Sequence, residues 1–151
     1  DGNVRILLEG LILSNGMEWS IDEKFFYHTD SDTWTVKEYS FDKQSGDIEF
    51  TGRQVKVPYV DGFTINQNGY LLAACWGCGH IAVIDTADMS IHEHIPIPAS
   101  IPASCGFFGD NMDMLAITTA SYNADLTKDE NTGYLCTAQM KTGGRKPYLF
   151  G

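Results

Sequence analysis

Three short segments, spaced almost evenly along the chain, place a residue with possible chemistry directly before a glycine. They begin at Asn15, Asp61 and Cys105, at offsets of 46 and 44 residues (61 − 15 and 105 − 61). An amide oxygen and a carboxylate are hard ligands, suited to a calcium-, magnesium- or zinc-type ion that keeps open positions for water or substrate. Asn-Gly and Asp-Gly are also common in turns, because these residues tolerate positive φ. Spacing alone leaves both interpretations open.

The three segments open three similar units, which indicates an internal repeat. Each unit continues with a turn and further β-type runs, and no segment carries a sustained helical period. The predicted first, second and third strands are 14–19, 24–30 and 35–41, then 60–65, 70–76 and 80–85, then 104–108, 113–119 and 133–138. A more polar fourth strand closes only the first two units, at 53–57 and 91–95. The sequence therefore predicts an all-β protein.

Units of about 45 residues with four strands are typical of β-propeller blades, whose first strand flanks a central channel and whose fourth forms the outer edge. We predict blades at 14–58, 60–102 and 104–151, the last without its outer strand. Residues 1–10, with the apolar run around Ile6, are predicted to be the outer strand of a preceding blade.

Three blades leave two unpaired faces, because propellers close with roughly four to eight blades. We expect a second copy of the chain or a separate N-terminal half to supply the rest, and we expect the lone chain to be unstable. Equivalent positions of successive blades converge on the axis. Asn15, Asp61 and Cys105 are therefore expected to line one end of the channel together.

The composition excludes several classes of partner. The 20 acidic residues outnumber the 10 basic ones, giving a net charge of −10, which argues against binding a nucleic-acid backbone. No apolar run reaches the ~18 residues that a membrane helix needs, and the first residues lack the pattern of a signal peptide. Four cysteines are too few for a disulfide framework, which favours reduced thiols and a cytoplasmic location.

Other candidate residues have simpler explanations. Cys75 and Cys78 have C-x-x-C spacing, but they fall at a strand end and a turn, which favours ordinary packing. His92 and His94 are expected to share one side of an outer strand, more as a solvated edge than as a metal site. His28 either approaches the channel or is a hydrogen-bonded core histidine. The acidic stretch 125–131 is interpreted as a solvated loop, and packing roles are assigned to Trp19, Trp34 and Trp76.

Six motifs, in order and spread over nearly the whole chain, resemble the signatures of the regucalcin, gluconolactonase and luciferin-regenerating enzyme family. They are Ser14-Asn15-Gly16-Met17-Glu18-Trp19-Ser20, Phe26-Tyr27 through Asp30-Ser31, Tyr39-Ser40-Phe41-Asp42, Asp61-Gly62-Phe63-Thr64-Ile65, Trp76-Gly77-Cys78-Gly79 and Ser104-Cys105-Gly106-Phe107. The resemblance implies a six-bladed propeller, of which this chain would be the C-terminal half. It also implies one divalent metal ion (calcium, zinc, magnesium or manganese) near the channel mouth.

The activity that the resemblance implies is metal-dependent hydrolysis of small, sugar-type lactones, complete only with the missing blades. Asn15 and Asp61 would be metal ligands, and Asp61 would also be the general base. The chain departs from the family at Val60, where proline is usual, and at Ala103, where threonine is usual. The family's third ligand, a glutamate, and its sugar-pocket Arg and Asn residues belong to the N-terminal half. The alternative is a non-catalytic metal-binding or interaction propeller, because one fold serves many functions.

Overall fold

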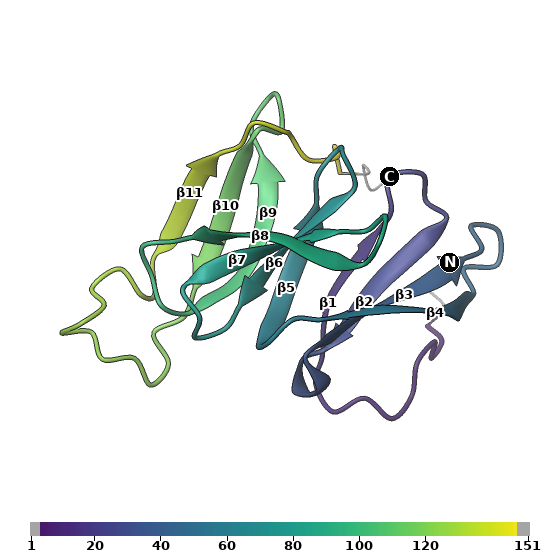
Figure 1. Ribbon diagram of the computed structural model, residues 1–151, viewed down its shortest axis with the longest axis horizontal. Helices are drawn as coiled ribbons and strands as arrows, with labels where there is room; N and C mark the ends of the chain where they lie inside the picture. The colour runs from purple at the N-terminus through teal and green to yellow at the C-terminus, as the bar shows by residue number, and fades with distance from the viewer. Residues whose placement is uncertain (1–3, 148–151) are drawn as a thin grey trace.

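The computed structural model describes residues 4–147, which form three antiparallel sheets that lie side by side (Figure 1). The strands are β1 (Ser14–Trp19), β2 (Phe25–Asp30), β3 (Thr35–Phe41) and β4 (Ile48–Lys56) in the first sheet, β5 (Val60–Ile65), β6 (Tyr70–Cys75), β7 (His80–Asp85) and β8 (Ser90–Pro96) in the second, and β9 (Pro102–Phe108), β10 (Met114–Thr119) and β11 (Leu135–Gln139) in the third. A short 3-10 helix, η1 (Ser31–Thr33), connects β2 to β3. The all-β prediction is confirmed, and the arrangement is consistent with a propeller-like fold. That the three sheets form half of a six-bladed ring stays a prediction.

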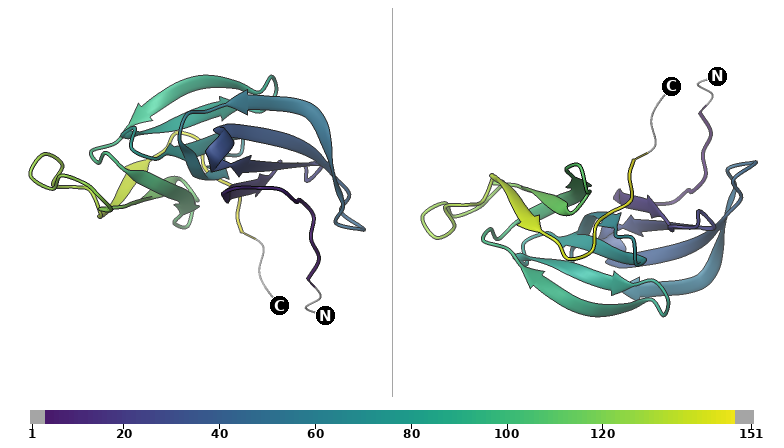
Figure 2. Two further views of the ribbon diagram at one scale, coloured as in Figure 1. Left: turned by 90° about the horizontal axis from the view of Figure 1, so that it is seen from below. Right: turned by 90° about the horizontal axis from the view of Figure 1, so that it is seen from above.

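The second sheet lies between the other two and is buried on both faces. Its inner strand β5 contacts both β1 and β9 (Figure 2). Along β6, Leu71 and Ala73 pack in the core shared with the first sheet, whereas Leu72 and Ala74 pack in the core shared with the third. A strand with two buried faces needs a continuous apolar run rather than an alternating one, and residues 71–75 supply it.

A partly buried ion pair lies within the first sheet, and its arginine also reaches the second sheet. Glu38 of β3 has 1% of its side chain exposed, and Arg53 of β4 donates from Nη1 to both of its carboxylate oxygens, at 3.0 and 2.9 Å. The other guanidinium nitrogen, Nη2, donates to the backbone carbonyls of Thr86 and Ala87 in the β7–β8 turn. The polar outer strand of the first sheet is therefore a junction between sheets as well as an edge.

Residues 4–9, which were predicted to be an outer strand, form no strand here. The side chains of Val4 and Ile6 are mostly exposed, while Arg5 donates to Asp47 and to the carbonyl of Ser45. A β-strand needs a neighbouring strand to pair its backbone groups. The prediction concerns a blade that this chain does not contain, so it stays a prediction; residues 1–3 lie outside the described part.

The segment after β11 crosses the ends of β5 and β1 that are opposite Asp61 and Asn15. Gly144 pairs with Asn66 and packs so closely on Phe107 that an added Cβ would lie 2.2 Å from the ring. Arg145 Nη2 then donates to Glu18 Oε1, at 2.7 Å, at the far end of β1. The tail thus ties the third sheet to the first. Within residues 4–147, no helix has the length and apolar character required to span a membrane.

Candidate active site

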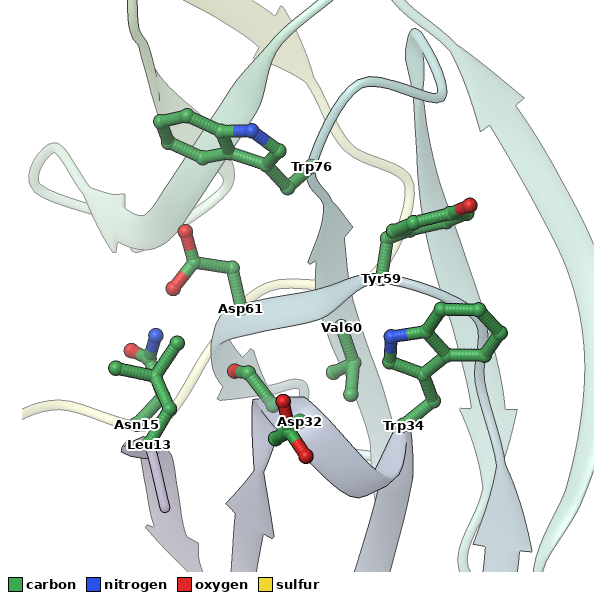
Figure 3. Close-up of a pocket in the computed structure, with 9 residues that line it drawn as sticks. Leu13, Asn15, Asp32, Trp34, Tyr59, Val60, Asp61 and Trp76 are labelled. Atoms are coloured by element: carbon green, nitrogen blue, oxygen red, sulfur yellow. The ribbon is translucent and has the colours of Figure 1, made fainter.

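The two predicted ligand residues meet in one cavity between the first and second sheets (Figure 3). The cavity has a volume of about 350 Å³, within the range typical of small-molecule sites. Its lining residues are Leu13, Asn15, Ser31, Asp32, Trp34, Tyr59, Val60, Asp61 and Trp76.

Two β-bulges direct the ligand side chains into this cavity. Asn15 and Gly16 lie together opposite a single residue of β2, and Asp61 and Gly62 lie together opposite a single residue of β6. A bulge bends its strand locally and re-aims a side chain that regular pairing would place in the sheet face. Neighbouring inner strands with the same irregularity therefore present an amide and a carboxylate at one channel mouth.

The glycines allow these inner strands to approach each other. A Cβ on Gly16 would lie 2.5 Å from the backbone carbonyl oxygen of Asp61, and one on Gly62 would lie 2.3 Å from Ser104 Oγ. Both contacts are far shorter than van der Waals separation, and the first involves backbone that cannot move aside. The absence of a side chain at Gly16 is thus a condition for placing Asp61 beside Asn15.

We expect Gly16→Ala to lower the free energy of unfolding by about 3 kcal/mol, the upper part of the range for overpacked sites, because β1 and β5 must separate. The measurement is urea unfolding followed by tryptophan fluorescence. Gly106→Ala is the matched control, since it is also on an inner strand but an added Cβ would meet nothing within 4 Å. Equal effects from the two substitutions would contradict the close-approach argument.

The Asp61 carboxyl is partly buried, and this burial changes its pKa. Burial raises the pKa of the Asp61 carboxyl above its usual value, while a hydrogen bond with Asn15 acts in the opposite direction. A nearby cation would favour the ionised form. The two side-chain oxygens are of the kind that suits a hard divalent ion, and they would supply two protein ligands. Among residues 4–147, no three His, Cys, Asp or Glu side chains are grouped closely enough to hold a metal.

Cys105, which was predicted to line the channel mouth with the other two, does not. Its Sγ donates to the backbone carbonyl of Leu72 at 3.1 Å, within the core between the second and third sheets, and burial raises the pKa of the thiol to about 12. The register explains the error. In β9 the extra residue is Ala103, two positions earlier, so Ala103 occupies the place of Asn15 and Asp61 in the other sheets.

His28 contacts the residue before Asn15, Ser14, and does not line the cavity. Its buried ring has Nε2 within 2.9 Å of Ser14 Oγ, and burial lowers the pKa of the imidazole. Nearby, the Asp30 carboxylate accepts hydrogen bonds from the backbone N–H groups of Ile12 and Leu13, at 3.0 and 2.9 Å. These contacts hold the segment that leads into the Asn15 bulge. Of the two alternatives for His28, the structure shows the hydrogen-bonded core residue.

The other two histidines of interest lie on opposite faces of the second sheet. The ring of His92 packs on Tyr70, with centroids 5.3 Å apart, whereas His94 packs on His80, with centroids 4.4 Å apart. The expectation that they share one side is wrong, because a register shift between β7 and β8 falls between them.

The two cysteines and the acidic loop do not line the cavity. Cys75 and Cys78 are free thiols, and burial raises the pKa of Cys75 to about 11. A buried, protonated thiol agrees with the predicted packing role. In the loop 125–131, the Asp129 carboxylate accepts hydrogen bonds from Ser100 and Thr132. This loop is therefore anchored to the neighbouring segments.

The tryptophans divide between packing and the cavity. Trp19 packs against Phe26 and Phe41, as predicted. Trp34 and Trp76, however, line the cavity. This position of the two tryptophans was not predicted from the sequence, and neither was that of Tyr59. The available signal was that Trp34 and Tyr59 fall between predicted strands, whereas Trp76 was expected at the end of the strand 70–76 and lies in a turn.

Comparison with known families identifies the family of the chain. The sequence model of the SMP-30/Gluconolactonase/LRE-like region matches residues 1–121, which include both bulged strands. The chain belongs to this family.

Individual relatives cover almost all of the chain. A Bacillus subtilis (strain 168) protein named "Putative sugar lactone lactonase YvrE" is 31% identical over 159 residues, which is 99% of this chain and 54% of that protein. Pentonolactonase XacC of Haloferax volcanii is 31% identical, over 88% of this chain and 48% of its own length. The solved structure of a calcium-binding protein, regucalcin, from Agrobacterium tumefaciens matches with a TM-score of 0.86 at 21% identity, over 95% of this chain and 51% of that one. The chain spans about half the length of the curated relatives it matches.

Proposed function

We propose that the protein, once its ring is complete, hydrolyses small sugar-type lactones with one divalent cation held by Asn15 and Asp61. The observation that carries the proposal is the meeting of these two oxygen ligands on adjacent bulged strands in one cavity. Relatives named lactonases support lactone hydrolysis at the level of the family. The candidate cations are calcium, zinc, magnesium and manganese, of which the hard oxygen donors favour calcium or magnesium.

The residues of this chain have defined tasks in that reaction. When bound, a divalent cation polarises the lactone carbonyl and lowers the pKa of a coordinated water. Asp61 accepts a proton as a water molecule adds to the carbonyl carbon, and it returns the proton to the ring oxygen as the carbon–oxygen bond breaks. The product is the open-chain hydroxy acid. Asn15 holds the cation beside the Asp61 carboxylate and has no proton to transfer.

The missing blades complete the site in this proposal. Either an N-terminal half of the same protein or a second copy of the chain would supply them, and the family resemblance implies that the third ligand is a glutamate from that part. With two protein ligands, the chain alone is expected to bind a cation weakly. The small-molecule partner of the completed site is then the lactone substrate.

Removal of the metal tests the proposal directly. We expect the full-length protein to open gluconolactone, measured as acid release in a pH-stat, to lose this activity after dialysis against a chelator, and to regain it with one of the four cations. Unchanged turnover after the metal content has been shown to be negligible would sink the metal-dependent mechanism. Cation binding by calorimetry without opening of any sugar lactone would instead favour the non-catalytic metal-binding propeller.

A further inference from the structure

Three aromatic side chains form a wall of the cavity that the proposed hydrolysis does not use. The rings of Trp34 and Tyr59 lie with centroids 4.5 Å apart at an interplanar angle of 42°, and Trp76 lies on the side of Asp61 away from Asn15 (Figure 3). Tyr59 is 48% exposed and Trp76 is 36% exposed, so both present large apolar surfaces to solvent. We call these three residues the aromatic wall.

The backbone connects the three members, although they come from different segments. The carbonyl of Trp34, at the end of η1, accepts a hydrogen bond from Val57 N–H, at 2.8 Å. Two residues later the carbonyl of Tyr59 accepts one from Trp76 N–H, also at 2.8 Å. The linker between β4 and β5 therefore fixes both tryptophan-bearing turns. A wall held in this way loses little conformational entropy when a ligand binds.

The backbone at two of these positions is unfavourable for an aromatic residue. Trp34 has φ of 54° and Tyr59 has φ of 58°, both in the left-handed region that glycine adopts without a steric penalty. Bulky residues are uncommon there, and such strained positions cluster at functional sites. Trp34 is partly buried against Tyr59, whereas the exposed ring of Tyr59 contributes little to the core, so packing alone does not account for Tyr59.

Apolar side chains also line the cavity near the ligand pair. Leu13 lies beside Asn15, and Val60 lies between Asp61 and Trp34. The lining also includes a second carboxylate, Asp32, but no Lys or Arg, which disfavours an anionic substituent. A lactone with its carbonyl at the ligand pair would thus place its far side against flat, apolar surface.

We propose that the aromatic wall selects lactones that carry an uncharged, flat apolar substituent, such as an aryl ring, remote from the carbonyl. This inference rests on the proposed lactone hydrolysis and extends its substrate class beyond the sugar-type lactones. Stacking of a substituent on Trp34 and Tyr59 adds an aromatic contact to the burial of apolar area. Selectivity is then set by this wall, while the reaction takes place at the ligand pair.

The test compares a phenyl-substituted γ-lactone with the same lactone lacking the phenyl group. For the full-length protein we expect kcat/KM to favour the phenyl lactone, and Tyr59→Gly to lower that preference about tenfold. Glycine is chosen because it suits the φ of 58°, so loss of the ring is not accompanied by backbone strain. Tyr122→Ala, which removes a 73% exposed ring outside the cavity, is the control and should leave the preference unchanged.

A binding measurement separates this inference from the proposed hydrolysis. A phenyl-substituted cyclic ketone, which cannot be hydrolysed, is expected to quench tryptophan fluorescence and to bind about tenfold more weakly to Tyr59→Gly. If lactones are opened but Tyr59→Gly changes neither the preference nor ketone binding, the aromatic wall has no such role. If no lactone is opened but ketone binding still depends on Tyr59, the hydrolysis fails and the apolar binding site remains.

Discussion

Asp61→Asn is expected to lower kcat/KM for lactone opening by about 10³-fold in the complete protein, within the range for loss of a positioned proton acceptor. The substitution keeps the size of the side chain and one oxygen, but removes the charge that holds the cation and the basic site that takes a proton from water. Asn15→Ala should act mainly through the cation, so part of its activity should return at high metal concentration. The measurements are initial rates over a series of metal concentrations.

The lower activity of Asp61→Asn is not expected to come from unfolding of the variant, because the raised pKa of Asp61 shows that its charge does not stabilise the fold. Because burial raises the folded-state pKa, the ionised carboxylate opposes folding once the pH is above the unfolded value near 3.8. Without metal, the contribution of Asp61 to stability is therefore fully present below that value and is lost as pH rises through the raised folded-state pKa. Asp61→Asn should match or slightly exceed the parent in urea unfolding at pH 7 with a chelator present.

Asp32→Asn provides the matched control for charge in the cavity. Asp32 lines the same cavity, and its ordered contact with Asp30 uses the backbone N–H, which the substitution leaves intact. Most of the lactone-opening rate should therefore remain. If Asp32→Asn and Asp61→Asn reduce the rate equally, general loss of negative charge explains the effect, and the specific role of Asp61 is wrong.

The strands of this fold could be predicted because the repeat recurs with regular apolar runs, but the register within each unit could not. The alignment through glycine was correct for Asn15 and Asp61, since both precede the glycine of a bulge. The same rule failed at Cys105, because the extra residue in β9 lies two positions earlier. His92 and His94 were misplaced for the same reason. A bulge inserts one residue without a change in composition, so a single sequence gives little sign of it.

Contacts between neighbouring sheets also could not be predicted from the amino-acid sequence. The repeat indicated which strand is outermost, but not that Arg53 reaches across to the next sheet. The aromatic wall combines residues from separate turns, and the left-handed φ of Trp34 and Tyr59 contradicts ordinary residue preferences. Such features depend on how neighbouring sheets pack, which local patterns do not encode.

Arg53→Ala is expected to lower the free energy of unfolding by about 3 kcal/mol, the effect of leaving a buried charge without its partner. Glu38 has almost no exposure, and Arg53 Nη1 contacts both of its carboxylate oxygens. The substitution also removes two hydrogen bonds from Nη2 to carbonyls of the β7–β8 turn, which join the first and second sheets. Urea unfolding monitored by circular dichroism measures the change, and Lys56→Ala, at an exposed position of the same strand, is the control.

The double variant Glu38→Gln/Arg53→Met identifies the origin of the effect. If the uncompensated charge dominates, removing it with Glu38→Gln should recover more than half of the stability lost in Arg53→Ala, since methionine keeps the apolar stem of the arginine. If the double variant is as unstable as Arg53→Ala, the hydrogen bonds to the β7–β8 turn dominate, and the ion pair matters chiefly because it orients Arg53 towards that turn. In either case Arg53 couples the first sheet to the second through its hydrogen bonds to the carbonyls of Thr86 and Ala87.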